Sequence, residues 1–285
     1  MKQLFLIALL LCSVRSSGQI QLFEFRGEKN TVWQYWDAIK TDYQRQQTIP
    51  KIIDKIEIPF DYVRENVKKG EQLDSFHLID INADGLNDVI FEGFDGGNEE
   101  SLVFYINTGD TYQKSRVIKG RIQRIERSSN NSLLSFTIHD YHCCATFVDH
   151  ILTLDIVRKE SKYEFILHND FAYMYDTEQP DHFISKTPFV TINAEYKLRA
   201  QPIIDNNYDN LPEEEIIDGN TVAIYPKGSR GYAIAKHTDE TERIWWFVVM
   251  ENNLKPLKSN LYTGNNELSF RSLGWMSSRY VKKLN

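Results

Sequence analysis

Cysteine is scarce in this chain, which has only three cysteines among its 285 residues. Cys12 lies in an N-terminal apolar segment, and the other two form the adjacent pair Cys143-Cys144. A bridge between neighbouring residues closes a small strained ring outside the usual disulfide geometry. The fold therefore does not depend on a disulfide framework, although an exported protein could oxidise this pair.

Positively charged residues are also fewer than negatively charged ones. The chain has 33 Lys and Arg residues against 40 Asp and Glu residues, which gives a formal net charge of −7. Binding to a phosphate backbone depends on clustered Lys and Arg, so an acidic chain without a basic stripe is a poor nucleic-acid binder. We expect no nucleic-acid partner. The sequence also lacks a visible repeat of 20–50 residues.

Long apolar runs are missing except at the N-terminus. A short positive start, Met1-Lys2-Gln3, precedes the apolar residues 4–11 and a small, polar exit at residues 13–18. This pattern predicts a secretory signal peptide over residues 1–18. The apolar run is too short to span a bilayer, and no later stretch is long enough, so we expect no transmembrane segment.

Export implies a periplasmic or secreted protein. Loss of residues 1–18 removes Lys2 and Arg15, which moves the net charge from −7 to −9. A lipoprotein is the alternative, because Cys12 follows the apolar run. Lipidation signals usually place a small residue before the cysteine, and Leu11 occupies that position, so the ordinary signal peptide is the preferred interpretation.

The length of the mature chain, roughly 265 residues, favours two domains. We predict a β-rich domain over residues 19–168, a polar linker with Pro180 over 169–187, and a small β-barrel over 188–285. The predicted fold class is mainly β, an antiparallel sheet or sandwich with one N-terminal helix followed by the barrel. An acidic loop is expected at residues 205–215.

The one predicted helix begins at Thr31, which forms a capping box with Gln34. Apolar residues at helical spacing follow it, and the helix is expected to end before Pro50. Strand patterns separated by turn residues then follow, and their short connections indicate antiparallel neighbours. The expected strands are residues 57–63, 75–80, 88–93, 101–106, 115–126, 132–140, 146–157 and 162–168.

A short loop carries the clearest chemical signal in the chain. Its sequence, Asp80-Ile81-Asn82-Ala83-Asp84-Gly85-Leu86-Asn87-Asp88, places side-chain oxygens at positions one, three, five and nine. Calcium takes six to eight oxygen ligands, and Gly85 allows the backbone to turn sharply. The spacing predicts a Ca²⁺ site formed by the side chains of Asp80, Asn82, Asp84 and Asp88 and the main-chain carbonyl of Leu86.

This loop and its flanking strands resemble the calcium loop of FG-GAP and VCBS repeats, the blades of integrin-type β-propellers. The resemblance covers fewer than 20 residues and occurs once, so it implies a single grafted loop and not a propeller. An EF-hand is disfavoured, because position twelve is Phe91 instead of an acid. The alternative to metal binding is a turn whose Asp and Asn side chains bond their own backbone.

A second candidate site contains His139, His142, Cys143, Cys144 and His150. Cysteine and histidine can bind zinc or copper, and a cysteine beside a histidine can act as a nucleophile. However, adjacent residues of a strand face opposite ways, so Cys143 and Cys144 diverge. A vicinal disulfide, or two buried thiols in a turn, is the preferred interpretation, and a hydrolase that uses this cluster is the alternative function.

Residues 188–285 resemble the bacterial SH3 (SH3b) domain, an SH3-like barrel. Three stretches carry the likeness, namely residues 190–202, the aromatic run at 245–249 and the closing run at 274–281. Of the neighbours Trp245 and Trp246, one is expected in the core. Tyr208, Tyr225 and Tyr232 are candidates for an exposed ligand groove.

SH3b modules of exported bacterial proteins commonly bind cell-wall peptides or glycans, or dock a neighbouring domain. The resemblance therefore implies an envelope peptide, glycan or protein as partner. Taken together, the sequence predicts a non-enzymatic exported bacterial binding or docking protein with Ca²⁺ as its only cofactor. A scaffold that only supports an oligomer is a further alternative.

Overall fold

The computed structural model describes residues 32–36, 42–97, 100–128, 132–141, 148–159, 162–207, 217, 219–252, 254–261 and 270–284. Contacts divide the chain into two compact units, an N-terminal unit, Lys29–Asp170, and a C-terminal unit that contains Phe171–Asn285. The predicted signal peptide lies outside the described residues. Within the described ranges, no helix combines the length and the apolar character needed to cross a membrane.

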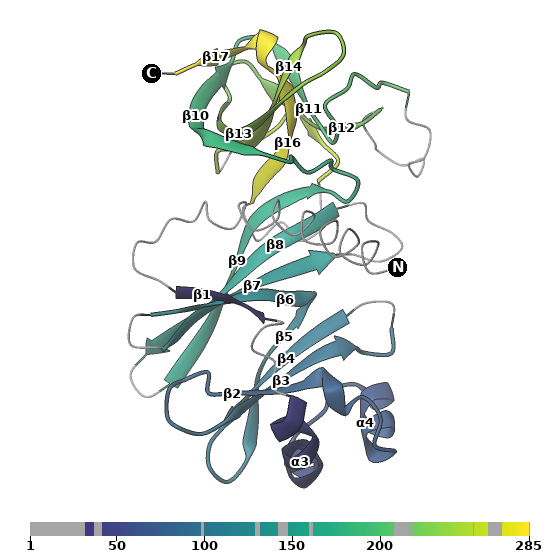
Figure 1. Cartoon of the computed structure of the whole chain (residues 1–285), viewed down its shortest axis with the longest axis vertical. Helices are drawn as coiled ribbons and strands as arrows, with labels where there is room; N and C mark the ends of the chain where they lie inside the picture. The colour runs from purple at the N-terminus through teal and green to yellow at the C-terminus, as the bar shows by residue number, and fades with distance from the viewer. Residues whose placement is uncertain are drawn as a thin grey trace, which may run out of the picture. The chain divides into compact units, whose positions relative to one another are not determined.

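The N-terminal unit contains two sheets and two described α-helices (Figure 1). The first sheet is an antiparallel meander in the order β2-β3-β4-β5, and the second has the order β1-β6-β7-β8-β9. The strands are β1 (Val32–Tyr35), β2 (Phe76–Ile79), β3 (Asp88–Phe94), β4 (Glu100–Asn107), β5 (Tyr112–Lys119), β6 (Arg121–Arg127), β7 (Leu133–Tyr141), β8 (Val148–Lys159) and β9 (Lys162–Met174). The helices are α3 (Asp42–Ile52) and α4 (Asp61–Lys68), with 3₁₀ turns η1 (Ile53–Lys55) and η2 (Leu73–Ser75).

The central strands of the first sheet, β3 and β4, are buried on both faces. On one face, Phe76, Phe91 and Tyr105 pack with residues of α3, α4 and the chain between them, including Ile49 and Val63. The other face packs against the second sheet, and this cluster contains Trp36, Ile90, Leu102, Phe104, Ile125, Phe136, Leu154 and Phe165. The unit is therefore a β-sandwich with a layer of helices (Figure 1).

The mainly β fold class is confirmed, but the predicted helix start is wrong. Val32–Tyr35 forms β1, which pairs antiparallel with β6 from Val32 opposite Arg127 to Tyr35 opposite Arg124. Valine, tryptophan and tyrosine suit a strand, and pairing with an existing sheet outweighs the weaker helical pattern. The proposed cap, Thr31, lies outside the described residues.

Helix α3 overlaps the expected helix over residues 42–49, and α4 is a second helix that the sequence did not indicate. Helix α3 continues through Pro50 to Ile52, where burial of Ile49 holds its last turns against the first sheet. Residues 57–63, expected as a strand, instead lead into α4. Val63 and Val67 lie four residues apart on the buried face of that helix, the spacing expected of one helical turn.

The C-terminal unit is formed by antiparallel strands in the order β17-β10-β13-β14-β16, with β11 and β12 following from β16. Its core contains Phe189, Leu198, Trp245, Phe247 and Trp275. The elements are β10 (Phe183–Thr191), β11 (Glu195–Arg199), β12 (Thr221–Pro226), β13 (Arg230–Thr238), β14 (Ile244–Met250), β15 (Lys258–Ser259), β16 (Arg271–Ser277), η3 (Ser278–Tyr280) and β17 (Val281–Lys283).

The residues predicted as a linker, 169–187, are mostly part of the C-terminal unit. The unit boundary falls inside β9, and Phe171 and Ala172 pair in parallel with Arg271 and Ser272 of β16. The carbonyl of Glu178 accepts a hydrogen bond from Trp275 Nε1 at 2.7 Å. The segment is ordered because Phe171, Ala172 and Met174 are apolar and buried.

A buried carboxylate joins three segments of the N-terminal unit. Glu92 Oε2 accepts a hydrogen bond from Trp36 Nε1 at 2.7 Å and lies 3.3 Å from His77 Nε2. Glu92 Oε1 accepts one from the main-chain N–H of Ile122 at 2.8 Å. The side chain thus links the segment after β1 to both sheets.

We expect Glu92→Gln to lower the free energy of unfolding by about 2–4 kcal/mol, because the new amide places an N–H donor against donors that are already buried. Denaturant unfolding measures the change. Glu71→Gln is the control, since Glu71 is an exposed glutamate whose substitution is expected to stay within about 0.5 kcal/mol. Equal effects of the two variants would contradict a linking role for Glu92.

Candidate functional site

The predicted calcium loop connects β2 to β3. Three of its polar side chains accept hydrogen bonds from the loop's own backbone. Asp80 Oδ1 and Asn82 Oδ1 both accept from the N–H of Asp84, at 3.2 and 3.1 Å. Asp80 Oδ2 accepts from Gly85 N at 3.0 Å, and Asp84 Oδ1 accepts from Leu86 N at 2.8 Å. Asn82 Nδ2 donates to Asp84 Oδ2 at 2.9 Å. The loop therefore brings Asp80, Asn82 and Asp84 together.

The backbone of the loop explains its glycine. Ala83 and Gly85 have φ values of 57° and 85°, in the left-handed region where a side chain is disfavoured. A Cβ on Gly85 would meet no atom within 4 Å. Position 85 therefore favours glycine because of its backbone conformation and not because space is lacking. This is the role that the sequence motif predicts for Gly85.

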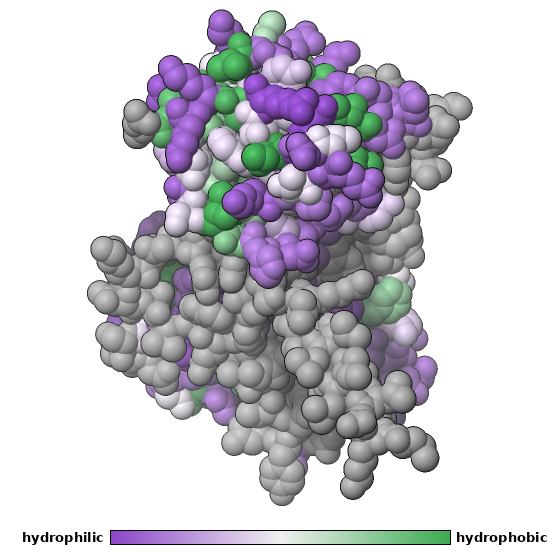
Figure 2. All heavy atoms as spheres, turned by 45° about the horizontal axis from the view of Figure 1, so that its top comes forward, coloured by the Kyte–Doolittle hydropathy of each residue, from purple (hydrophilic) through white to green (hydrophobic). Residues whose placement is uncertain are grey.

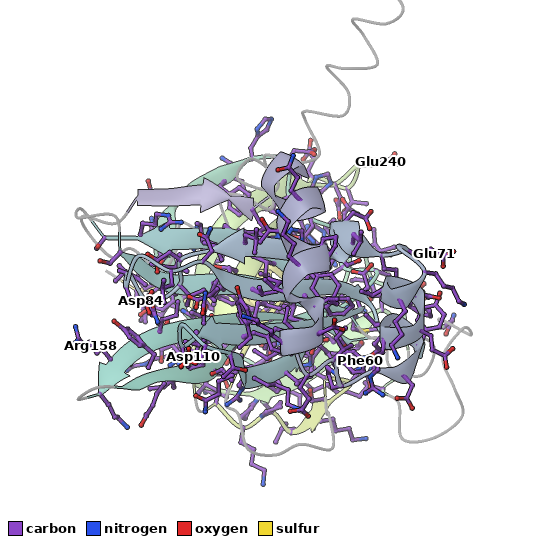
Figure 3. All side chains as sticks on the ribbon, turned by 90° about the horizontal axis from the view of Figure 1, so that it is seen from below. Phe60, Glu71, Asp84, Asp110, Arg158 and Glu240 are labelled. Carbon is purple, nitrogen blue, oxygen red and sulfur yellow. The ribbon has the colours of Figure 1, made fainter. Side chains whose placement is uncertain are left out.

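Asp88, the fourth predicted side-chain ligand, is placed differently. Its side chain is fully buried, with 0% of its surface exposed. Oδ2 accepts from the N–H of Ile81 and Oδ1 from the N–H of Asn107, both at 2.7 Å. Asp88 therefore joins the loop to the end of β4, whereas Asp84 is exposed at the same end of the unit as Asp110 of the β4–β5 turn (Figure 3).

The electrostatics of the loop leave an excess of negative charge. Burial raises the pKa of Asp88 to about 6; two main-chain hydrogen bonds oppose this rise, and the charges of Asp84 and Asp80 add to it. Burial lowers the pKa of Arg127, and the negative charge of Asp80 partly offsets this by raising it. Arg127 is thus a neighbour of Asp80 that the sequence motif did not reveal.

The loop offers a mixed set of oxygen donors to a metal ion. Within the described ranges, no group of three or more His, Cys, Asp or Glu side chains is arranged to hold a metal. A site in this loop would have to combine the carboxylates of Asp80 and Asp84 with the amide oxygen of Asn82 and the carbonyl of Leu86. Such a set of neutral and charged oxygens suits a hard cation such as Ca²⁺. In this structure these side-chain oxygens accept N–H groups of the loop, as the alternative of an Asx turn predicts.

The histidines described in the second candidate cluster face opposite sides of the second sheet. His139 is paired with Ile151 across β7 and β8, and Asp140 with His150. Directly paired residues share a face and adjacent residues do not, so His139 and His150 are on opposite faces. His139 Nε2 lies 3.1 Å from Asp149 Oδ2. His142, Cys143 and Cys144 lie outside the described residues.

The aromatic candidates of the C-terminal unit divide between core and surface. Trp245 is buried and Trp246 only partly, which confirms that one of the pair fills the core. Tyr225 is buried and bonds Ser272 through its hydroxyl, so it cannot line an exposed groove. Tyr232 lies under the ammonium of Lys186, with 3.8 Å from Nζ to the ring centroid. Tyr208 lies outside the described residues.

A different aromatic pair reaches the surface. The rings of Tyr196 and Tyr280 are 5.7 Å apart in an edge-to-face arrangement. Tyr196 donates its hydroxyl to the carbonyl of Ser277 at 2.6 Å, and 44% of Tyr280 is exposed. Both tyrosines lie within the stretches that resemble SH3b, but their contact joins residues far apart in the sequence and could not be read from it.

Comparisons with known proteins identify no relative of this chain. No protein-family model matches the chain, and neither the curated proteins nor the solved structures contain a match.

Without calcium, we expect Asp88 to make stability depend on pH. Its folded pKa of about 6 exceeds the usual 3.8, so its stabilising contribution is complete below about pH 4 and is lost as pH rises through about 6. In chelator, the unfolding free energy of the wild type relative to Asp88→Asn should rise by about 1–3 kcal/mol between about pH 7.5 and pH 4.5.

Denaturant unfolding of both proteins across this pH range measures the difference. The comparison is needed because Asp80, Asp84 and Tyr112 also interact with Asp88. A difference that stays constant with pH would show that the carboxyl group of Asp88 has an ordinary pKa.

Proposed function

We propose that this protein is an exported, non-enzymatic binding protein of the bacterial envelope. In this proposal, Ca²⁺ orders the loop between β2 and β3, and an SH3b-like C-terminal unit contacts a cell-wall peptide, a glycan or a protein. The observation that carries the binding role is the exposed Tyr280 packed edge-on against Tyr196. Export rests on the signal-peptide pattern of residues 1–18.

The charge balance of the loop supports the calcium part of the proposal. The charges of Asp84 and Asp80 add to the raised pKa of Asp88, and the charge of Asp80 also acts on the guanidinium of Arg127. The loop thus brings like charges close together, which disfavours their ionised forms. Bound calcium would supply positive charge that offsets this repulsion, so its role would be to stabilise the loop.

The arrangement of the C-terminal strands supports the SH3b-like part. The stretches that carry the resemblance form β10–β11, β14 and β16 to β17, and β14 pairs directly with β16. The described surface in Figure 2 is largely hydrophilic, with small, separate hydrophobic areas. Single exposed apolar residues on a polar surface are ordinary and do not indicate a binding site. The packed Tyr196–Tyr280 pair is therefore the better candidate for a ligand-contact surface.

Tyrosine pairs suit peptides and glycans because each ring offers an apolar face and a polar hydroxyl. Tyr280 is held by main-chain contacts, since its carbonyl accepts a hydrogen bond from Ile192 N at 3.1 Å. A contact surface whose backbone is already ordered loses less entropy on binding. The hydrolase alternative has weaker support, because His139 and His150 are on opposite faces of their sheet.

We expect the purified full chain to bind one Ca²⁺, measured by calorimetry with calcium chloride. Calcium at about ten times Kd should add about 1.4 kcal/mol to the unfolding free energy. Asp84→Asn should raise Kd more than about 100-fold, because it removes a charged donor from the loop. Asp110→Asn is the control, since Asp110 is an exposed aspartate at the same end of the unit. An absence of calcium uptake by the wild type would refute the calcium part.

We expect Tyr280→Ala to reduce co-sedimentation of the protein with isolated peptidoglycan at least about tenfold, because it removes the exposed ring of the pair. Thermal unfolding should change little, since 44% of Tyr280 is exposed and its main-chain contacts remain. Tyr62→Ala is the matched control, because Tyr62 is a similarly exposed tyrosine of the N-terminal unit. If the wild type does not sediment, peptidoglycan is excluded as the ligand, and if both variants behave alike, the tyrosine pair is not the contact surface.

A further inference from the structure

Asp88 connects two loops that the sequence keeps apart. Its carboxylate accepts one hydrogen bond from Ile81 N, inside the predicted calcium loop, and one from Asn107 N, at the end of β4. Both contacts are 2.7 Å, in the range of charge-assisted hydrogen bonds. The side chain is fully buried, so both oxygens are turned toward main-chain donors and away from solvent.

Asn107 continues this connection into the β4–β5 turn. Its Nδ2 donates to the carbonyl of Asn87 at 3.1 Å and to the hydroxyl of Tyr112 at 3.4 Å. Its Oδ1 accepts from Gly109 N at 2.9 Å. The turn closes with a hydrogen bond from Thr108 N to the carbonyl of Thr111. One chain of contacts therefore runs from Ile81 through Asp88 and Asn107 to the turn.

The other three polar side chains of the loop are placed differently. Asp80, Asn82 and Asp84 form hydrogen bonds with one another and with N–H groups of residues 84–86. Asp84 is exposed, whereas Asp88 is not. A metal ion that enters the loop from solvent therefore meets Asp84 and not the carboxylate of Asp88.

We infer that Asp88 is a positioning residue and not a metal ligand, and that it transmits the order of the calcium loop to the β4–β5 turn. This inference rests on the proposed calcium binding. It departs from the motif, which assigns Asp88 to the metal. Calcium held by the other donors restrains the loop, Asp88 restrains Ile81 and Asn107 together, and the turn becomes ordered as a consequence.

The experiment compares four full-length proteins: wild type, Asp84→Asn, Asp88→Asn and Asn107→Ala. Calcium affinity is measured by calorimetry, and hydrogen exchange of the peptide that covers residues 107–112 is measured with calcium and with chelator. We expect Asp84→Asn to raise Kd more than about 100-fold. Asp88→Asn should raise it about tenfold, at the low end of the effects of outer-shell partners. Calcium should slow exchange in the turn of the wild type but not in that of Asp88→Asn.

Asn107→Ala serves as a second test if Asp88→Asn does not fold, because it keeps the main-chain N–H that Asp88 binds. It should retain calcium affinity within about threefold and lose the calcium-dependent protection of the turn. An equal loss of affinity in Asp88→Asn and Asp84→Asn would overturn the inference while leaving calcium binding intact. Calcium-dependent protection that survives in Asn107→Ala would overturn the coupling. No uptake by the wild type would refute the proposed function and this inference together.

Discussion

The arrangement of the N-terminal unit depends on one sheet whose central strands are buried on both faces. Strands β3 and β4 place alternate residues against the helices and against the second sheet, so neither face can be polar. This constraint explains the continuous apolar runs at residues 89–91 and 102–105. It also fixes both ends of the β2–β3 connection, so the polar loop at residues 80–88 extends from a rigid support.

Two buried carboxylates show how such a core accommodates charge. Glu92 and Asp88 each accept a main-chain N–H from a different segment, Ile122 in one case and Asn107 in the other. A buried charge is tolerated only when donors replace the lost water. Each acid therefore acts as a connection between segments, which gives it a structural role beyond any chemistry that its residue type suggests.

The prediction of strands was accurate where polar turns punctuate the chain, because turn residues and alternation are local signals. The expected strand at residues 115–126 is in fact β5 and β6, which are separated at Gly120 with φ of 108°. The start of the helix was misplaced because the aromatic residues of β1 fit either the helical or the strand period, and only pairing with β6 distinguishes the two. Helix α4 was missed because its buried face contains only Val63 and Val67.

By itself, the sequence determined the mainly β class, the turn conformation at Gly85 and the grouping of Asp80, Asn82 and Asp84, because all three depend on residues within one short segment. The tertiary structure alone decided the burial of Asp88, the contact of Tyr196 with Tyr280 and the separation of His139 from His150. These features depend on which strands become neighbours, and strand pairing joins residues that no local pattern relates.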